Sequence, residues 1–361
     1  MKKYLATIYN LFVYSFGQPK LYYKNGNLKS SFQVFADLIY WYWKEKYFNN
    51  MYYAMGLNLK ENNVKNYFGR KRFYRVKNRA ERFMKIKAKC NDLNFDVITK
   101  DKFYAASILS ANDIPIIPTE ILVVNGRFIV NGSEIGFNET LFKEKCSYII
   151  KDTALEAGEG ILVCVRNGNN FVINGKECSK DVFLNKLQNK ICIIQRKIDS
   201  HFDIRKINDS ALNTTRIVTI RNGDDIKYLA GFQSFATNGA EIDSWSSGSV
   251  YAGIDIENSC LKKYAITSVS DNRPGLLEEH PDSNIVFEGY KIPYLNESVE
   301  LCIKAHRLFY FNFVIGWDIA ITDDGPIIVE ANEKPGMNVV QCVDGGLYRK
   351  VLTNYKQLID S

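Results

Sequence analysis

Three oxygen-bearing side chains stand out between Gly316 and Gln341, in the stretch GWDIAITDDGPIIVEANEKPGMNVVQ. Asp318, Glu330 and Asn332 interrupt two otherwise apolar runs, which predict two short strands around a tight turn. Two carboxylates and an amide oxygen, with no Cys or His beside them, are typical ligands of a hard cation such as Mg2+, and Mn2+ accepts the same set. The alternative interpretation is the solvated face of an ordinary hairpin.

The register of this hairpin decides whether the three groups meet. A three-residue loop over 323–325 would place Thr322 opposite Pro326, and counting back from there places Asp318 opposite Glu330. Side chains alternate along a strand, so Asn332 lies on the same face as Glu330. The intervening residues are apolar, which predicts that the other face of the hairpin is buried. We therefore expect all three ligands on one face of the ribbon.

Two lysines further upstream are candidates for contact with phosphate. Lys151 ends the apolar run SYIIK and precedes TALEAGEGILV, which reads as a loop with Gly158 and Gly160 leading into a strand. A lysine in this position suits phosphate, because its charge and the loop N–H groups both attract anionic oxygens. Lys102 is the second candidate. The alternative is that these are lysines at ordinary element ends.

The run ICIIQRKI predicts a buried strand that emerges into polar residues. The segment from Gln195 through Lys197 to Ile198 could pair its backbone with the edge of a purine, while apolar side chains sandwich the ring. A plain strand end is the alternative.

Arg216 begins another predicted strand, directly after Asn213 and Thr215 in LNTTRIVTI. An arginine beside a metal site can hold a carboxylate bidentately or stabilise a developing negative charge. A surface ion pair is the alternative. Further along, EIDSWSSGS contains Trp245 and Ser246 and reads either as a substrate loop or as a tight turn around a packed tryptophan.

Composition indicates a protein of the cytosolic, globular class. With 46% apolar and 24% charged residues, the 361-residue chain has ample material for two or three packed units. The eight cysteines form no CxxC pair and several lie in apolar runs, as expected of buried, reduced thiols. No apolar run reaches the length of a membrane span. The N-terminus resembles a signal peptide in Lys2, Lys3 and a semi-apolar run, but Asn10 and aromatic residues interrupt that run and no small-residue cleavage site follows. We expect a cytoplasmic protein, with peripheral contact to the inner membrane as a further option.

Charge is unevenly distributed along the chain. Residues 1–95 contain 19 Lys and Arg against 5 Asp and Glu, whereas residues 96–361 contain 28 against 35. A basic region of this kind favours an anionic membrane surface or a polyanionic substrate such as a polysaccharide. Nucleic acid is not favoured, because no RNA-binding sheet motif or zinc finger accompanies the basic run at 70–89. A solvated basic face is the alternative.

The pattern of elements predicts an α+β protein in three parts. Residues 1–95 form a helical, basic and aromatic region, with a helix that carries Phe32, Phe35, Ile39, Tyr42 and Trp43 on one side. Residues 96–195 alternate hairpins with one helix and form a first lobe. Residues 196–361 form a second lobe, with a helix over 297–313, the metal hairpin and a C-terminal helix.

Taken in chain order, these pieces resemble the ATP-grasp superfamily, and specifically its sugar-transfer-associated family from bacterial surface-polysaccharide biosynthesis. The resemblance covers residues 50–345 and is tightest in the last part of the chain. Two departures stand out, since Asp152 follows Lys151 where the family has proline, and Gln195 stands where glutamate is common. The matching elements are Lys102, Lys151, QRKIDSH (195–201), LNTTRIVTI (212–220), DSWSSGS (243–249), GWDIAIT (316–322) and VEANEKPG (329–336).

The resemblance implies that two α+β lobes sandwich ATP. Lys102 and Lys151 would then contact its phosphates together with the loop of Gly158 and Gly160. The adenine hinge would run from Gln195 through Lys197 to Ile198. The remaining roles implied are one or two Mg2+ ions on Asp318, Glu330 and Asn332, the γ-phosphate and acceptor at Arg216, and substrate contacts at Asn213, Thr215, Trp245 and Ser246.

The resemblance also implies a reaction class. Superfamily members usually phosphorylate a carboxylate and let an amine displace the phosphate, so we expect an ATP- and Mg2+-dependent ligase that forms an amide during capsule or lipopolysaccharide decoration. One alternative is a phosphotransferase that phosphorylates an amide, alcohol or sugar on the same fold. The other is a non-catalytic protein that docks on a polyanion or membrane.

Overall fold

The computed structural model describes residues 2–16, 22–23, 26–45, 47–69, 95–138, 141–155, 160–243, 248–267 and 275–360. The basic run 70–89 and three of the predicted site residues, Gly158, Trp245 and Ser246, lie outside these ranges. Within the described ranges, no helix combines the length and apolar character that crossing a membrane requires.

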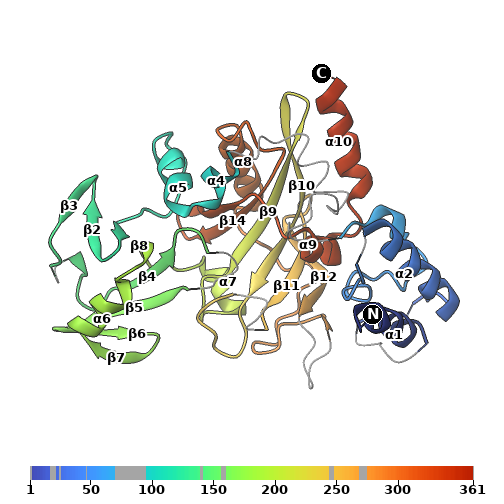
Figure 1. The fold of residues 1–361 in the computed structure, drawn as a ribbon, viewed down its shortest axis with the longest axis horizontal. Helices are drawn as coiled ribbons and strands as arrows, with labels where there is room; N and C mark the ends of the chain where they lie inside the picture. The colour runs from blue at the N-terminus through green and yellow to red at the C-terminus, as the bar shows by residue number, and fades with distance from the viewer. Residues whose placement is uncertain are drawn as a thin grey trace.

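A central sheet of seven strands carries most of the molecule, in the order β13-β12-β11-β10-β9-β14-β15 (Figure 1). Its neighbouring strands are all antiparallel. β9 and β14, which adjoin in the sheet, are separated by about 100 residues of chain and bring distant motifs together. The strands are β9 (Thr214–Asn222), β10 (Asp225–Phe235), β11 (Val250–Asp255), β12 (Cys260–Thr267), β13 (Leu276–Leu277), β14 (Val314–Thr322) and β15 (Gly325–Asn332).

An outer sheet of eight shorter strands forms a second lobe, in the order β3-β2-β1-β8-β4-β5-β6-β7. One helix, α6 (Lys180–Leu187), covers it, and stacked rings of Phe171 and Phe183, 4.2 Å apart, sit in its core. The predicted α+β architecture of two lobes is confirmed. The strands are β1 (Ile121–Val124), β2 (Arg127–Val130), β3 (Ser133–Ile135), β4 (Ser147–Asp152), β5 (Leu162–Asn167), β6 (Asn170–Ile173), β7 (Lys176–Ser179) and β8 (Ile191–Arg196).

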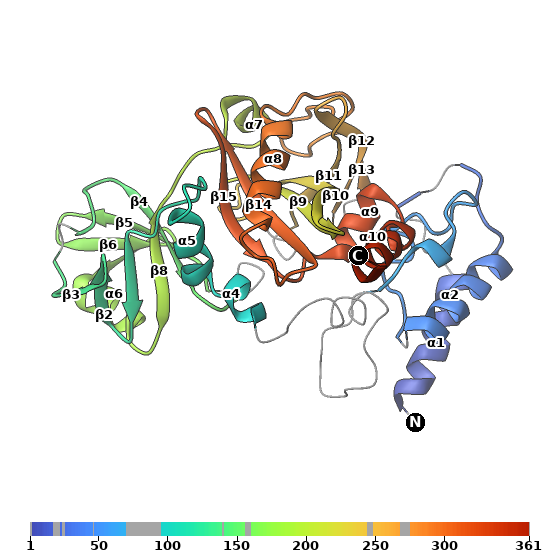
Figure 2. The same cartoon turned by 90° about the horizontal axis from the view of Figure 1, so that it is seen from above.

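Helices cover both faces of the central sheet (Figure 2). On one face the apolar core holds α4 (Asp96–Lys100), α5 (Lys102–Ser110), α7 (Phe202–Ile207) and α8 (Leu295–His306). On the other face a separate core joins α9 (Met337–Asp344), α10 (Tyr348–Asp360) and the short helix η1 (Val64–Asn66) to the N-terminal helices. These are α1 (Lys2–Phe16) and α2 (Ser31–Glu45), which lie side by side at the edge farthest from the outer sheet.

The predicted helix in the N-terminal region is confirmed as α2, and the side that it buries is not the one that carries Phe32, Ile39 and Trp43. The buried stripe consists of Val34, Leu38 and Trp41. Phe32 and Trp43 are 76% and 60% exposed. Both sides of α2 are apolar, so periodicity alone could not identify which one meets the core.

The metal hairpin has the predicted pairing at its ligands and a different turn at its tip. Thr322 pairs with Gly325 rather than with Pro326, so the loop has two residues instead of three. A bulge next to Asp318 then shifts the register by one residue and restores the predicted pairing of Asp318 with Glu330. The prediction was therefore wrong about the turn and right about the ligands.

The helix predicted over 297–313 ends earlier, at His306, where α8 stops. The imidazole explains the turn that follows, because its Nε2 lies 3.0 Å from the carbonyl of Asn312. On the other ring nitrogen, Nδ1 lies 2.7 Å from the Thr219 hydroxyl, which also accepts the Trp317 indole N–H at 2.8 Å. Thr219 therefore donates to Nδ1, and the buried imidazole is neutral with its proton on Nε2. This chain of contacts fastens α8 to the underside of β14.

Burial lowers the pKa of His306 to about 4, which makes stability depend on pH. Because the folded pKa lies below the unfolded one, the contribution is fully present above about pH 6.5 and is lost as the pH falls towards 4. We expect a loss of ~3 kcal/mol in the free energy of unfolding across that window. Urea titrations at several pH values measure it. The His306→Leu variant should lose this pH dependence, whereas Lys304→Leu, an exposed change on the same helix, should keep it.

Candidate active site

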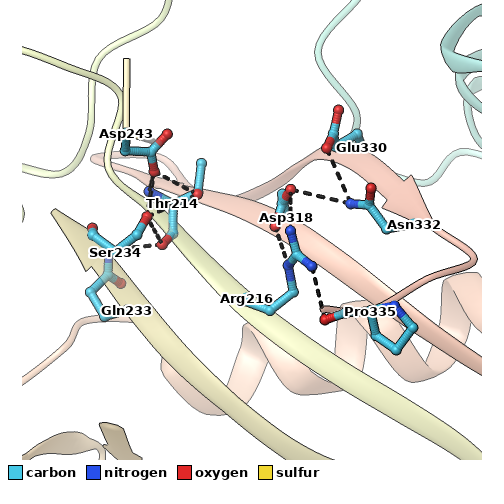
Figure 3. Close-up of polar contacts among 9 residues, drawn as sticks. All are labelled: Thr214, Arg216, Gln233, Ser234, Asp243, Asp318, Glu330, Asn332 and Pro335. Carbon is cyan, nitrogen blue, oxygen red and sulfur yellow. Dashed lines mark hydrogen bonds and ion pairs between the residues drawn. The ribbon is translucent and has the colours of Figure 1, made fainter. Parts of the chain in front are cut away.

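Three charged side chains lie in one row across adjacent strands of the central sheet. Cross-strand pairing places Asp318 of β14 between Arg216 of β9 and Glu330 of β15. Figure 3 shows the row at the surface of the sheet, with Asn332 beside the two carboxylates. The row lies on the same side of the sheet as α9, since Val218 and Val314, two and four residues away on the same strand faces, belong to that core.

Arg216 holds Asp318 in a bidentate ion pair. Its Nε lies 2.5 Å from Oδ1, and its Nη2 lies 3.0 Å from Oδ2. The third contact, from Nη1 to the carbonyl of Pro335 at 3.0 Å, joins the start of α9 to the row. Both side chains are largely buried, so this charge-assisted pair fixes the direction of the Asp318 carboxylate.

Asn332 completes the predicted set of three ligands. Its Nδ2 donates to Asp318 Oδ2 at 3.2 Å and to Glu330 Oε1 at 3.1 Å. The structure thus brings together all three residues that the sequence predicts as metal ligands. Within the described ranges no three His, Cys, Asp or Glu residues converge, so the set here is two carboxylates and one amide.

The electrostatics of the two carboxylates favour a bound cation. Burial raises the pKa of Asp318 to about 7, because the bidentate contact with Arg216 only partly offsets burial and the adjacent charge of Glu330. The pKa of Glu330 is lowered instead, because Lys102 and the other nearby cations outweigh its burial. Two adjacent buried carboxylates, whose negative charges disfavour each other, are a donor set that a divalent oxygen-seeking cation fits.

Lys151 and Gln195 of the outer sheet, together with Lys102 at the start of α5, face this row. Lys102, Lys151 and Gln195 line one small cavity together with Glu330. A second cavity is lined by Lys102, Glu330 and Asn332. Their volumes of about 10 and 30 Å3 suffice for water only, so the walls must separate to admit a larger ligand.

Lys151, Lys102 and Gln195 differ in their burial and hydrogen bonds. Lys151 is 8% exposed at the end of β4, and burial lowers its pKa. Lys102 opens α5, and its Nζ donates to the carbonyl of Leu155 at 2.5 Å. Gln195 on β8 donates from Nε2 to the carbonyl of Ile117 at 2.9 Å, while its buried Oε1 has no hydrogen-bond partner within the described ranges. An unsatisfied acceptor in this position suits a ligand with an N–H donor.

Comparison with known families identifies the chain. A family model described as sugar-transfer associated ATP-grasp matches residues 80–357. The chain belongs to this family. A search of curated proteins finds no significant match.

Solved structures similar to this family member share its fold at low identity. They include the D-alanine–D-alanine ligase of Bacillus anthracis, with 12% identity, a TM-score of 0.40 and coverage of 73% of this chain and 66% of that one. The L-amino acid ligase of Bacillus licheniformis has 10% identity, a TM-score of 0.37 and coverage of 72% and 48%. The carboxyaminoimidazole ribonucleotide synthase of Aspergillus clavatus, complexed with ATP, has 13% identity and a TM-score of 0.37, with coverage of 65% of this chain and 44% of that one. The chain thus spans between 44% and 66% of the length of these proteins, and the likeness concerns the fold alone.

The other residues predicted for this sugar-transfer-associated ATP-grasp protein have structural surroundings that qualify their roles. Asn213 is fully buried, and its side chain bonds the backbone of Asn208, Ala211 and Ala236. Thr215 bonds Gln233 on the face of β9 opposite to Arg216. Their substrate contacts stay predictions.

The structure also shows where Lys197, Ile198 and Gly160 lie, at the predicted hinge and phosphate loop. Lys197 and Ile198 follow β8, with Lys197 N–H bonded to the carbonyl of Ser147 at 2.9 Å. Gly160 has a positive φ of 74°, which suits a turn that leads into β5. Their contacts with a nucleotide stay predictions.

Sequence reasoning missed a second polar cluster beside the row. Asp243 accepts hydrogen bonds on Oδ2 from the N–H and hydroxyl of Thr214, at 3.0 and 2.8 Å, and from the hydroxyl of Ser234 (Figure 3). Thr214 lies two residues before Arg216 and on the same face of β9. Burial raises the pKa of Asp243, against these hydrogen bonds. The signal that could have found the cluster is the paired polar residues of β9 and β10, whose proximity depends on strand pairing.

Gly316 leaves the room that the row requires. A methyl group at this position would lie 2.7 Å from Pro335 Cα, whose carbonyl holds Arg216. We expect Gly316→Ala to lower the free energy of unfolding by about 1–3 kcal/mol, because backbone has to move. We also expect it to weaken Mg2+ binding. Thermal unfolding with and without Mg2+ measures both effects. Gly136→Ala, where a methyl group meets nothing within 4 Å, serves as the control and should be nearly neutral.

Proposed function

We propose that this protein is an ATP- and Mg2+-dependent ligase that joins a carboxylate to an amine through an acylphosphate. The carrying observation is the row of Arg216, Asp318 and Glu330, faced by Lys102 from α5 and by Lys151 from the outer sheet. Members of the family act, on this proposal, in the decoration of capsule or lipopolysaccharide on the cytoplasmic side of the membrane. The described site offers cationic side chains for the phosphates and oxygen ligands for a divalent cation. The reaction needs no protein nucleophile.

The residues would divide the binding of ATP between them. Lys102 and Lys151 neutralise phosphate charge, and Gln195 Oε1 accepts a hydrogen bond from the exocyclic amine of adenine, with Lys197 and Ile198 beside the ring. Asp318, Glu330 and Asn332 would hold Mg2+ or Mn2+, which supplies charge neutralisation between the phosphates. Arg216 fixes the direction of Asp318 and leaves two N–H groups for the acceptor or the γ-phosphate.

The reaction balances with ATP, a carboxylate and an amine. A carboxylate oxygen attacks the γ-phosphorus and ADP leaves, which gives an acylphosphate. The amine nitrogen then attacks the acyl carbon, phosphate leaves, and the amine loses a proton. Catalysis rests on positioning and on stabilisation of charge.

A phosphotransferase is the second candidate, and Asp243 is the observation that favours it. Its Oδ2 accepts hydrogen bonds from Thr214 and Ser234, which fix the carboxyl group beside the row. With a raised pKa, this carboxyl group could take the proton of an attacking hydroxyl. In the ligase it would instead take the proton of the amine.

Substitution of the metal ligands tests the proposed site. Asp318→Asn and Glu330→Gln should each lower ATP turnover roughly a hundredfold or more, because the cation loses a charged ligand. Asp324→Asn, at the exposed tip of the same hairpin, is the matched control and should keep the wild-type rate. Phosphorus NMR of the products then separates the reactions, since free phosphate supports the ligase and a stable new phosphorylated compound supports the kinase. Unchanged turnover in Glu330→Gln would contradict the site.

The basic run at 70–89 supports a separate proposal about partners. We propose that it docks an anionic substrate or surface, since 19 of the 24 charged residues in 1–95 are cationic. Replacing its Lys and Arg by Gln should weaken binding to an acidic polysaccharide and to anionic vesicles, most strongly at low salt. Co-sedimentation measures this. Unchanged binding to both would leave the non-catalytic docking function without support.

A further inference from the structure

The first N-terminal helix presents aromatic rings to solvent. Tyr9, Phe12 and Phe16 are 68%, 64% and 42% exposed. Their spacing of three and four residues places them on one side of α1. Between positions 9 and 16, every exposed side chain is one of these three rings.

The second N-terminal helix has an apolar stripe on each of two opposite sides. Phe32, Ile39 and Trp43 are 76%, 46% and 60% exposed, and the exposed Ala36 lies between the first two. The buried stripe of Val34, Leu38 and Trp41 faces the core from the other side. A helix that is apolar all round is normally covered on all sides.

Ring contacts join the two exposed stripes into one surface. The centroids of Phe12 and Phe16 are 5.0 Å apart, and those of Phe16 and Phe32 are 5.6 Å apart. Figures 1 and 2 both show α1 and α2 side by side at the edge of the molecule. We call this surface the apolar face, and define it as Tyr9, Phe12, Phe16, Phe32, Ile39 and Trp43. Contiguous exposed apolar surface of this kind marks a docking site.

The charge of the N-terminal sequence, and Lys44 beside Trp43, favour a lipid surface as the partner. The acids on α2 are withdrawn, because Asp37 pairs with Lys29 at 2.7 Å and Glu45 is 1% exposed. Lys44 is exposed and lies over the ring of Trp43, 4.5 Å from its centroid. Residues 1–69 contain nine Lys and three Asp or Glu. A second copy of this region would bring the same positive charge, whereas an anionic lipid surface would complement it.

The geometry favours helices that lie on a bilayer. At 15 residues, α1 and α2 are each about 22 Å long, shorter than the hydrocarbon core of a bilayer. Their inner stripes remain in the protein core, so only the apolar face is available to lipid. Exposed Trp, Tyr and Phe beside lysine are the composition of interfacial helices.

We propose that the apolar face of α1 and α2 docks this protein on anionic phospholipid bilayers, with its rings in the interface between headgroups and acyl chains. This surface is independent of the proposed ligase reaction. It also differs from the basic run at 70–89, because its contribution comes from burial of rings and persists at salt concentrations that screen charge.

Vesicle flotation with the full chain tests the proposal. We expect the protein to float with vesicles of mixed phosphatidylcholine and phosphatidylglycerol, and much less with phosphatidylcholine alone. Phe12→Ser and Phe32→Ser should each reduce the partition coefficient about tenfold. Tyr310→Ser, which removes a ring that is 70% exposed in another part of the chain, is the control and should bind as the wild type does.

Two further measurements separate docking from loss of structure. Thermal unfolding should be unchanged in the serine variants, because the substituted rings are exposed in the free protein. Tryptophan emission should shift to shorter wavelength on addition of anionic vesicles in the wild type, and much less in Trp43→Phe.

Several results would overturn the proposal. These are failure of the wild type to bind anionic vesicles, equal binding to both kinds of vesicle, and an equal loss in Tyr310→Ser. Another is a wild-type dimer, seen by light scattering, that Phe32→Ser dissociates, because a second copy would then be the occupant. ATP turnover is measured separately, so failure of the ligase proposal leaves this result intact.

Discussion

The bidentate contact between Arg216 and Asp318 is the interaction on which the rest of the site depends. It joins β9 to β14 at one position of the register, and through the carbonyl of Pro335 it also holds the start of α9. Partly desolvated charges attract strongly, but either one left alone would be costly. Gly316 follows from the same constraint, since Pro335 approaches Arg216 only where no side chain intervenes. The register of β9 and β14, the path of the loop at Pro335 and the direction of the Asp318 carboxylate therefore all depend on the same contact.

The two lobes meet at the strand that carries the proposed metal ligands. Ile117 N–H bonds the carbonyl of Ile328, and Ile328 N–H bonds the carbonyl of Pro115, so the approach to β1 pairs with β15. Gln195 reaches the same segment through the carbonyl of Ile117. The cavities beside this contact have volumes of only about 30 and 10 Å3. This short ladder therefore ties the approach to β1 to the edge of the central sheet.

Features that depend on residues close together in the sequence could be predicted from the sequence alone. Asp318, Glu330 and Asn332 could be predicted because a hairpin places neighbours in sequence opposite each other. Arg216 was predicted beside the metal site, but its pairing with Asp318 could not be, because β9 and β14 join residues 102 positions apart. The Asp243 cluster was missed for the same reason, since it needs the pairing of β9 with β10. The buried side of α2 could not be predicted, because the helix is apolar on two opposite sides and only the tertiary core distinguishes them.

The bulge beside Asp318 has a consequence for how this hairpin varies among related chains. Two register systems meet there: one is set by the turn, and the other by the ion pair with Arg216. A related chain with one residue more or fewer at the tip can absorb the difference in the bulge and leave the ligands in place. Ligand positions in such relatives are therefore counted from the end of the hairpin that meets β9 and α9. Counting from the acidic turn would shift one carboxylate onto the face that belongs to the apolar core.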